Sequence, residues 1–214
     1  MIRLSWTLNE KTPAYGNGDS LSLKTVKCMH AGDSCNTLQL SLSNHLGTHI
    51  DLPFHFDPKG QTLNDYPNDF FYFKNVQLET ITKEDGELIC KKDLQSIQAD
   101  KDCEILLINT GWAKKRHLKS YMMSPPGVHE NCADYLRDSF PKLRVLGFDF
   151  ISLSSFTNRT MGRKSHKAFL AHQRPICILE DMDLRDVKEI DNLLISPLMI
   201  DYADGTPVTV WANI

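Results

Sequence analysis

The chain has 214 residues, of which 41% are hydrophobic and 24% are charged, and its formal net charge is −3. This length allows one domain with a sizeable core, and the charge provides no basic surface of the kind that binds nucleic acid. No apolar run approaches the ~20 residues of a membrane span, and the first residues lack the apolar core of a signal peptide. We therefore expect one cytoplasmic domain over residues 1–214, without a nucleic-acid or membrane partner.

The first part of the chain alternates short extended runs with turns. Residues 13–19, Pro-Ala-Tyr-Gly-Asn-Gly-Asp, form a turn-rich loop in which Tyr15 could line a substrate pocket or lie on the surface. Residues 21–28 and 37–43 alternate well enough to be strands. Cys28, His30 and Cys35 imitate part of a zinc cluster, but a fourth ligand at suitable spacing is missing. We interpret all six scattered cysteines as reduced thiols.

Residues 45–55 are the most informative stretch, because three histidines and an aspartate fall within eleven residues. Histidine and carboxylate are common ligands of divalent metals, so this density favours a metal site over a strand end with solvated histidines. Neither a helix nor a straight strand brings His45, His49 and Asp51 together, because their spacings of four and two suit different elements. We therefore predict an irregular turn at Gly47 and Thr48.

Further strands and helices follow in a mixed order. We predict strands at 76–81, 104–109, 145–150 and 176–180, helices at 91–98, 130–140 and 163–171, and a C-terminal hairpin with strands at 198–200 and 208–210. The unbroken aliphatic run at 105–108 indicates a strand buried on both faces. Two later residues could supply donors to a second metal ion: His166, at a predicted helix, and Glu180, at a strand end. Together these elements predict an α/β fold with a mixed sheet.

The segment His45-x-Gly47-Thr48-His49-x-Asp51-x-Pro53-x-His55 resembles the signature of the putative cyclase family, which includes bacterial kynurenine formamidases and isatin hydrolase. The resemblance implies a swivelling β/β/α-type fold with a barrel-like mixed sheet flanked by helices. It also implies that His45, His49, Asp51, His166 and Glu180 bind one or two divalent ions. Histidine and carboxylate ligands suit zinc, manganese or iron, and we expect zinc or manganese. His172 is the alternative to His166, because the following connection is slightly longer than in formamidases.

The resemblance assigns acid–base catalysis to His55, with a third early metal ligand as the alternative role. It also implies self-association as a homodimer or homotetramer. The first functional hypothesis is a metal-dependent hydrolase of a small cyclic or aromatic amide or lactam, similar to an arylformamidase. The alternatives are a ring-closing or dehydrating cyclase, and a metal-containing binding protein without turnover. An intact His55 disfavours the binding protein, which would not need a proton donor.

Overall fold

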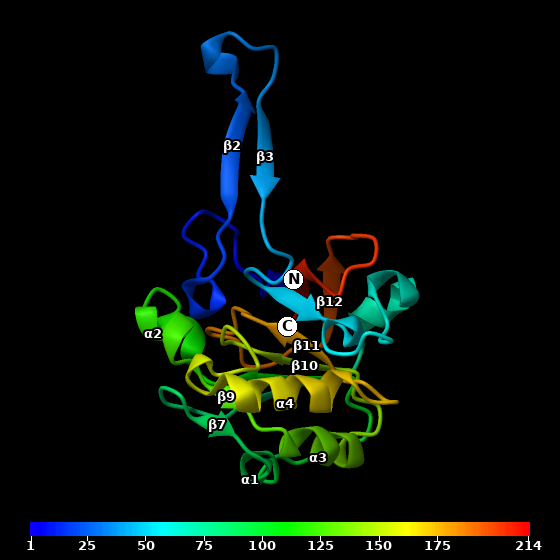
Figure 1. Ribbon diagram of the computed structural model, residues 1–214. Coiled ribbons are helices and arrows are strands. Elements are labelled where there is room, and N and C mark those ends of the chain that lie inside the picture. The colour runs from blue at the N-terminus through cyan, green and yellow to red at the C-terminus, as the bar shows by residue number, and fades with distance from the viewer.

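The computed structural model describes residues 1–214 and centres on a curved nine-stranded sheet (Figure 1). Its strand order is β5-β12-β13-β4-β11-β10-β8-β6, with β1 (Ile2–Arg3) paired to β13. The strands are β4 (His49–Asp51), β5 (Tyr72–Phe73), β6 (Val76–Thr80), β8 (Ile105–Asn109), β10 (Val145–Phe148), β11 (Cys177–Glu180), β12 (Asn192–Pro197) and β13 (Gly205–Asn213). Only Lys74 and Asn75 separate the two end strands β5 and β6, so the sheet nearly closes on itself. The predicted barrel-like mixed sheet is confirmed.

The central strands are buried on both faces because helices cover the outside of the sheet. Strands β6, β8, β10 and β11 run parallel, whereas β4, β13, β12 and β5 pair antiparallel. In β8, Leu106 and Ile108 pack with α3 (Asn131–Ser139) and α4 (Arg159–Leu170), whereas Ile105 and Leu107 pack in a second core on the other face. The doubly buried strand predicted from the aliphatic run is therefore correct. Two short helices, α1 (Lys91–Leu94) and α2 (Lys119–Met123), and the pair β7 (Leu88–Ile89) and β9 (Gly127–Val128) complete the fold.

Several predicted boundaries are wrong. The helix predicted at 163–171 begins at Arg159, because the Asn158 side chain accepts a hydrogen bond from the Met161 N–H and caps it. The helix predicted at 91–98 ends at Leu94. The C-terminal hairpin exists, but its first strand is β12, and Leu198, 55% exposed, already lies in the connecting loop. No helix has the length and apolar character needed to cross a membrane.

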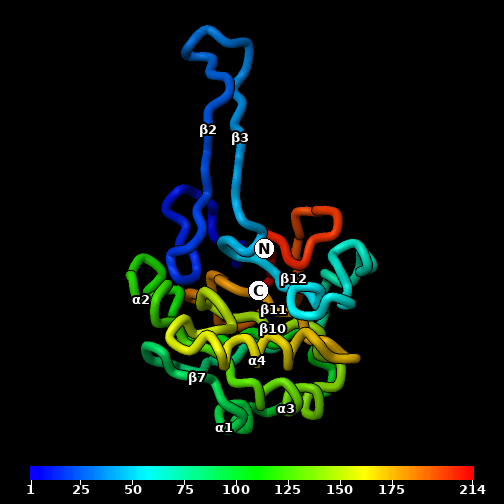
Figure 2. Tube along the Cα trace, viewed as in Figure 1, coloured from blue at the N-terminus to red at the C-terminus, as the bar shows by residue number.

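A two-stranded hairpin of β2 (Ser22–Lys27) and β3 (Thr37–Ser41) extends away from the sheet (Figure 2), and we call it the arm. Both strands were predicted. Every residue of the two strands is exposed except the half-buried Leu23. The arm is fixed only at its base, where Leu21 and Leu46 pack with Ala14.

Candidate metal and active site

Strand β4 carries two of the candidate ligands on one face. His49 and Asp51 are two residues apart, so both side chains point to the same side, while Ile50 between them enters the core. On the neighbouring strand β11, Glu180 pairs directly with His49. Cross-strand partners share a face, so Glu180 joins the other two. The exposed fractions of His49, Asp51 and Glu180 are only 3%, 1% and 2%.

The backbone before β4 bends so that His45 joins the same group. Residues 44–48 form turns and bends, and Gly47 has a φ of +72°, which side-chain-bearing residues rarely adopt. A Cβ at Gly47 would also lie 2.4 Å from Leu8 Cδ2. The predicted irregular turn is confirmed. It places His45 Nδ1 2.8 Å from Asp51 Oδ1.

The fifth residue, His166, arrives from helix α4. The helix packs so closely on the loop after β10 that a Cβ at Gly162 would lie 2.1 Å from Ser154 Oγ, so only glycine fits there. His166 donates its Nδ1–H to the Gly162 carbonyl at 2.9 Å, and His49 donates its Nδ1–H to the Gly47 carbonyl at 2.9 Å. Both imidazoles therefore direct Nε2, the usual ligand atom, toward the carboxylates.

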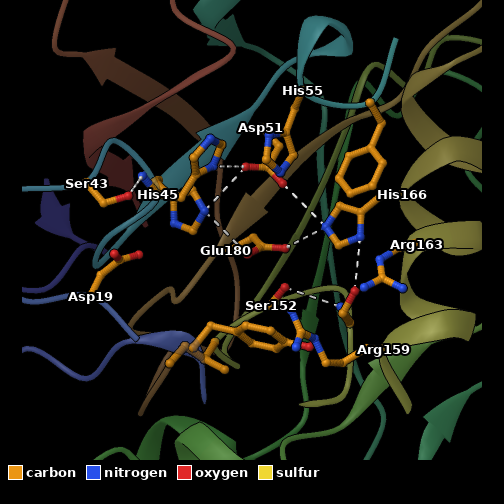
Figure 3. A pocket seen from close by; sticks show the side chains of 15 residues that line it. Asp19, Ser43, His45, Asp51, His55, Ser152, Arg159, Arg163, His166 and Glu180 are labelled. Carbon is orange, nitrogen blue, oxygen red and sulfur yellow. Dashed lines mark hydrogen bonds and ion pairs between the residues drawn. The ribbon is translucent and has the colours of Figure 1, made fainter. Parts of the chain in front are cut away.

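The separations between these atoms fit shared cations (Figure 3). His49 Nε2 lies 3.3 Å from Asp51 Oδ1 and 3.4 Å from Glu180 Oε2. His166 Nε2 lies 3.5 Å from Asp51 Oδ2 and 3.7 Å from Glu180 Oε1. Two donors bound tetrahedrally to one zinc-sized ion are roughly 3.4 Å apart. The donor set could therefore hold a divalent cation.

The pKa shifts within the cluster also favour bound positive charge. Burial acts to lower the pKa of His45, but Asp51 and Asp204 outweigh it and raise that pKa to about 10. Burial also opposes protonation of His166, yet Asp51 and Glu180 raise its pKa to about 10. Burial would raise the pKa of Asp51, but the surrounding histidines hold it well below its ordinary range. The carboxylates thus attract positive charge, which a divalent ion supplies in place of protons.

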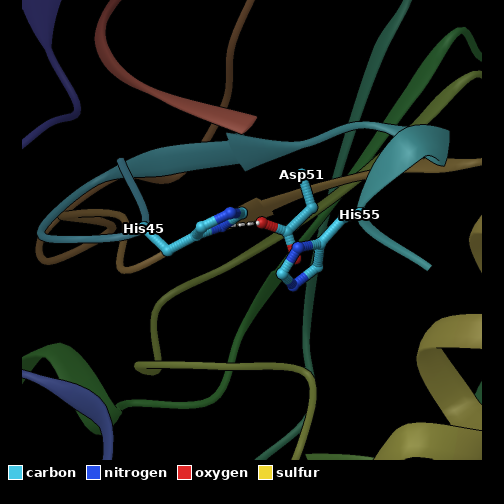
Figure 4. A group of neighbouring side chains, drawn as sticks. All are labelled: His45, Asp51 and His55. Atoms are coloured by element: carbon cyan, nitrogen blue, oxygen red, sulfur yellow. Dashed lines mark hydrogen bonds and ion pairs between the residues drawn. The ribbon is translucent and has the colours of Figure 1, made fainter. Parts of the chain in front are cut away.

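His55 lies beside His45 and Asp51 (Figure 4), and it pairs with Asp204, a residue that the sequence did not point to. Its Nδ1 is 2.7 Å from Asp204 Oδ2, and the same oxygen is 3.0 Å from His45 Nε2. Asp204 directly precedes Gly205, which pairs with Asp51 across β13 and β4. In the sequence Asp204 lies between the two strands predicted for the C-terminal hairpin, and only the strand pairing reveals its place at the site.

The position of His55 is compatible with metal binding and with acid–base catalysis. Potential ligand atoms of His45, Asp51 and His55 all lie within 4.8 Å of one another, as do those of His49, Asp51 and Glu180. His55 also lines the adjoining cavity, where it could meet a substrate.

A buried polar network behind Glu180 also escaped the sequence analysis. Thr48 Oγ donates to the Asp181 carbonyl at 2.6 Å, and the Trp6 backbone N–H donates to Thr48 Oγ at 3.0 Å. The Asp181 carboxylate accepts two hydrogen bonds from Arg116, at 2.8 and 2.7 Å. Because Asp181 follows Glu180, this network fixes the end of β11 that carries Glu180.

The cluster opens into a cavity of about 310 Å³, lined by fifteen residues of which three are hydrophobic. Tyr15 lies in its wall. His172 does not reach it: the side chain is exposed, and its Nδ1 accepts from the Arg174 N–H at 3.0 Å. Cys28, His30 and Cys35 lie at the far end of the arm and belong to neither group of potential ligands.

Comparison with known proteins agrees with this architecture. The sequence profile described as putative cyclase matches residues 2–155. Among curated relatives, the kynurenine formamidase of Geobacillus thermodenitrificans is 27% identical over 208 residues, covering 97% of this chain and 94% of that enzyme. A kynurenine formamidase of Bacillus cereus is 28% identical with the same coverage.

Solved structures show the same fold. Isatin hydrolase A from Labrenzia aggregata, bound to benzyl benzoate, superposes with a TM-score of 0.79 at 20% identity, over 98% of this chain and 91% of that one. A structure described as a predicted metal-dependent hydrolase from Bacillus stearothermophilus gives a TM-score of 0.76 at 21% identity, over 99% and 96% of the chains.

Proposed function

The chain belongs to the putative cyclase family, and on this basis we propose that it is a metal-dependent hydrolase of a small aromatic or cyclic amide. The observation that carries the proposal is the approach of two Nε2 atoms to the shared carboxylates of Asp51 and Glu180, at 3.3–3.7 Å, beside a ligand-sized cavity. The kynurenine formamidase relatives make an aryl formamide the first substrate to test. We take residues 1–214 as one hydrolase domain.

We assign His45, His49, Asp51, His166 and Glu180 as the residues that hold one or two divalent ions. A bound ion lowers the pKa of water toward ~7 and polarises a carbonyl oxygen. His45 must release one of its two carboxylate partners to act as a ligand, because both of its ring nitrogens are engaged. The donors are nitrogen and oxygen without thiolate, which suits zinc or manganese.

We assign His55 as the acid–base group. Asp204 accepts the Nδ1–H of His55, so the ring orientation is fixed and Nε2 is available for proton transfer. In hydrolysis, the attacking water loses a proton to His55 as its oxygen bonds to the amide carbon, and the departing nitrogen takes a proton as the C–N bond breaks. Imidazole can deliver that proton at neutral pH. Asp204 is a positioning residue in this scheme.

The test is to express the protein, measure bound metal by elemental analysis, and follow formate release from an aryl formamide and ring opening of isatin. We expect one to two divalent ions per chain and release of formate. Bound metal without turnover of any amide, lactam or formanilide would favour a cyclase or a binding protein instead.

We further propose that the chain self-associates as a homodimer or homotetramer. An isolated two-stranded hairpin is marginally stable in water, yet the arm exposes Val26, Leu38 and Leu40 by 52%, 57% and 58%. A second copy that covers these side chains would stabilise it. Sedimentation should show a multimer that a Leu38→Ser/Leu40→Ser variant weakens, whereas Leu118→Ser, on the body, does not. A monomeric wild type would contradict this proposal.

We also propose a reducing, cytoplasmic location. All six cysteines are free, and Cys35 is exposed. Fractionation of the native host followed by thiol titration would test it; recovery outside the cytoplasm would contradict it.

A further inference from the structure

The protein has a second cavity, of about 340 Å³, that shares no lining residue with the cavity at the histidine cluster. Its wall comes from three parts of the chain, residues 6–13, residues 113–117 and Arg185. None of the nine lining residues is acidic, and five carry basic side chains, namely Lys11, Lys114, Arg116, His117 and Arg185. A concave wall with this composition attracts anions, although the formal net charge of the whole chain is −3.

Part of this charge comes from a basic run in the sequence, residues 114–119, Lys-Lys-Arg-His-Leu-Lys. Charged runs are usually solvated and paired at the surface, and Lys115 follows that rule, because its Nζ lies 3.1 Å from an Asp85 carboxylate oxygen. Three other members of the run instead line the cavity, and these are Lys114, Arg116 and His117. The fold therefore gathers part of the run around one concave site.

The two guanidinium groups in the wall are held in place but keep free donors. Arg116 donates from Nε and Nη2 to Asp181 at 2.8 and 2.7 Å. Arg185 donates from the same two atoms to Asp183 at 2.8 and 2.9 Å. Both Cζ atoms also lie over the Trp6 ring, 4.6 and 4.5 Å from its centre. Neither Nη1 makes a hydrogen bond with the protein, so two oriented groups retain donors for a ligand.

The two lysines supply charge that no protein group offsets. The carboxylates of Asp181 and Asp183 balance the two guanidinium groups. The side chains of Lys11 and Lys114 are exposed and make no hydrogen bond or ion pair with the protein. Two free positive charges match a phosphate monoester, which carries about −1.5 to −2 charges at pH 7, whereas a carboxylate would neutralise only one of them.

The extent of the basic surface favours a small ligand over a polymer. A nucleic acid requires a basic stripe or face that follows several phosphates. Here the neighbouring cavity, which shares Lys11, Arg116 and His117, is also lined by Glu10 and Asp19. These carboxylates would repel a phosphate chain that continued in that direction, so the positive charge is confined to one cavity.

We propose that this cavity binds a small molecule through a phosphate group. Lys11 and Lys114 neutralise the phosphate, and the Nη1 groups of Arg116 and Arg185 donate hydrogen bonds to its oxygens. The site is separate from the hydrolase chemistry, and its assignment does not depend on that function. Arg116 nevertheless connects the two sites, because its partner Asp181 directly follows Glu180 at the end of β11.

Isothermal titration of phenyl phosphate into the metal-loaded protein tests this site, in ~0.1 M chloride to screen weak surface attraction. Lys11→Gln/Lys114→Gln removes both free charges without breaking a side-chain hydrogen bond. We expect this variant to bind roughly ten- to hundredfold more weakly, because it loses charge-assisted contacts to the phosphate. Lys164→Gln/Lys167→Gln removes the same charge from exposed positions of α4 outside the cavity and should bind like the wild type.

Capture of the phosphate by bound metal would be common to all three proteins, so equal affinity in all of them overturns the site. Absence of binding at millimolar phenyl phosphate also overturns it. Wild-type affinity in Lys11→Arg/Lys114→Arg, which keeps both charges, supports neutralisation by the two side chains. If a single-stranded oligonucleotide binds more tightly than phenyl phosphate, and Lys11→Gln/Lys114→Gln abolishes that binding, the surface belongs to a nucleic acid and the small-ligand proposal is wrong.

Discussion

The two walls of the cavity are built in opposite ways. On the strand wall, His49, Asp51 and Glu180 are almost fully buried, and each is held by neighbouring backbone or side chains. On the helix wall, Arg159 and Arg163 are exposed, and neither guanidinium makes a hydrogen bond or an ion pair with the protein, although Arg159 lies over the Phe156 ring. Buried charges must be paired to be stable, so the strand wall tolerates little change. Exposed arginines remain solvated and need no such pairing, so replacing them should change the stability of the protein little. We therefore expect substitutions of His49, Asp51 or Glu180 to cost metal binding or stability, and substitutions of Arg159 or Arg163 to leave both nearly unchanged.

The largest effect is expected when a proposed metal-binding side chain of the strand wall is replaced. His49→Ala should lower metal affinity by more than about a hundredfold and abolish amide hydrolysis, because it also leaves Asp51 and Glu180 facing each other. Elemental analysis and formate release check both effects. A variant that keeps its metal and its rate would remove His49 from the ligand set.

His55→Ala should act on the rate alone. We expect kcat to fall about a hundred- to ten-thousandfold with metal content nearly intact, because proton transfer is lost while the ions stay bound. If His55→Ala loses metal as His49→Ala does, His55 is a ligand. If it keeps metal and full activity, the acid–base assignment is wrong.

Asp204→Asn tests the positioning of His55. The amide cannot hold both His45 and His55 as the carboxylate does, so kcat should fall roughly ten- to hundredfold with little change in KM. Asp204→Glu should recover part of the loss. An equal fall in both variants, accompanied by lower thermal stability, would indicate a purely structural role.

Metal removal should make stability depend on pH. In the metal-free protein the pKa values of His45 and His166 are raised from 6.5 to about 10. Their protonated forms contribute stability that is complete below pH ~6.5 and is lost as pH rises toward 10. The Tm of the stripped protein should therefore fall by several degrees between pH 7 and pH 10. The loaded protein should change less, and parallel profiles for the two forms would contradict the account.

The smallest effect concerns the turn that leads into the strand wall. Gly47→Ala forces a side chain into left-handed backbone and toward Leu8, so the free energy of unfolding should fall by about 1–3 kcal/mol. Urea denaturation measures the change. Unaltered stability would show that the turn adapts easily.

The sequence was most informative where ligands are close together in the chain. The density of histidines around Asp51 and the awkward spacing of His45 were enough to predict a bend at Gly47, and the family signature pointed to His166 and Glu180. Asp204 could not be found this way, because it reaches His55 only through the pairing of β13 with β4.

The positions of the two arginines and the ends of several elements were not predicted correctly, for related reasons. Arg159 was placed outside the helix because the Asn158 cap was not recognised. The apolar run at 198–200 was mistaken for a strand, whereas Leu193 and Ile195 of β12 carry the alternating buried pattern. An unpaired charge, such as that of Arg163, can be recognised only when the positions of all its possible partners are known.

The most direct test of the metal-dependent hydrolase is restoration of activity. The protein is stripped with a chelator and titrated with zinc or manganese, while formate release from an aryl formamide and bound metal are measured on the same samples. We predict no release from the stripped protein and recovery in proportion to metal until one or two ions per chain are bound. Release that continues without metal, or metal uptake that His49→Ala and Glu180→Gln leave unchanged, would contradict the account.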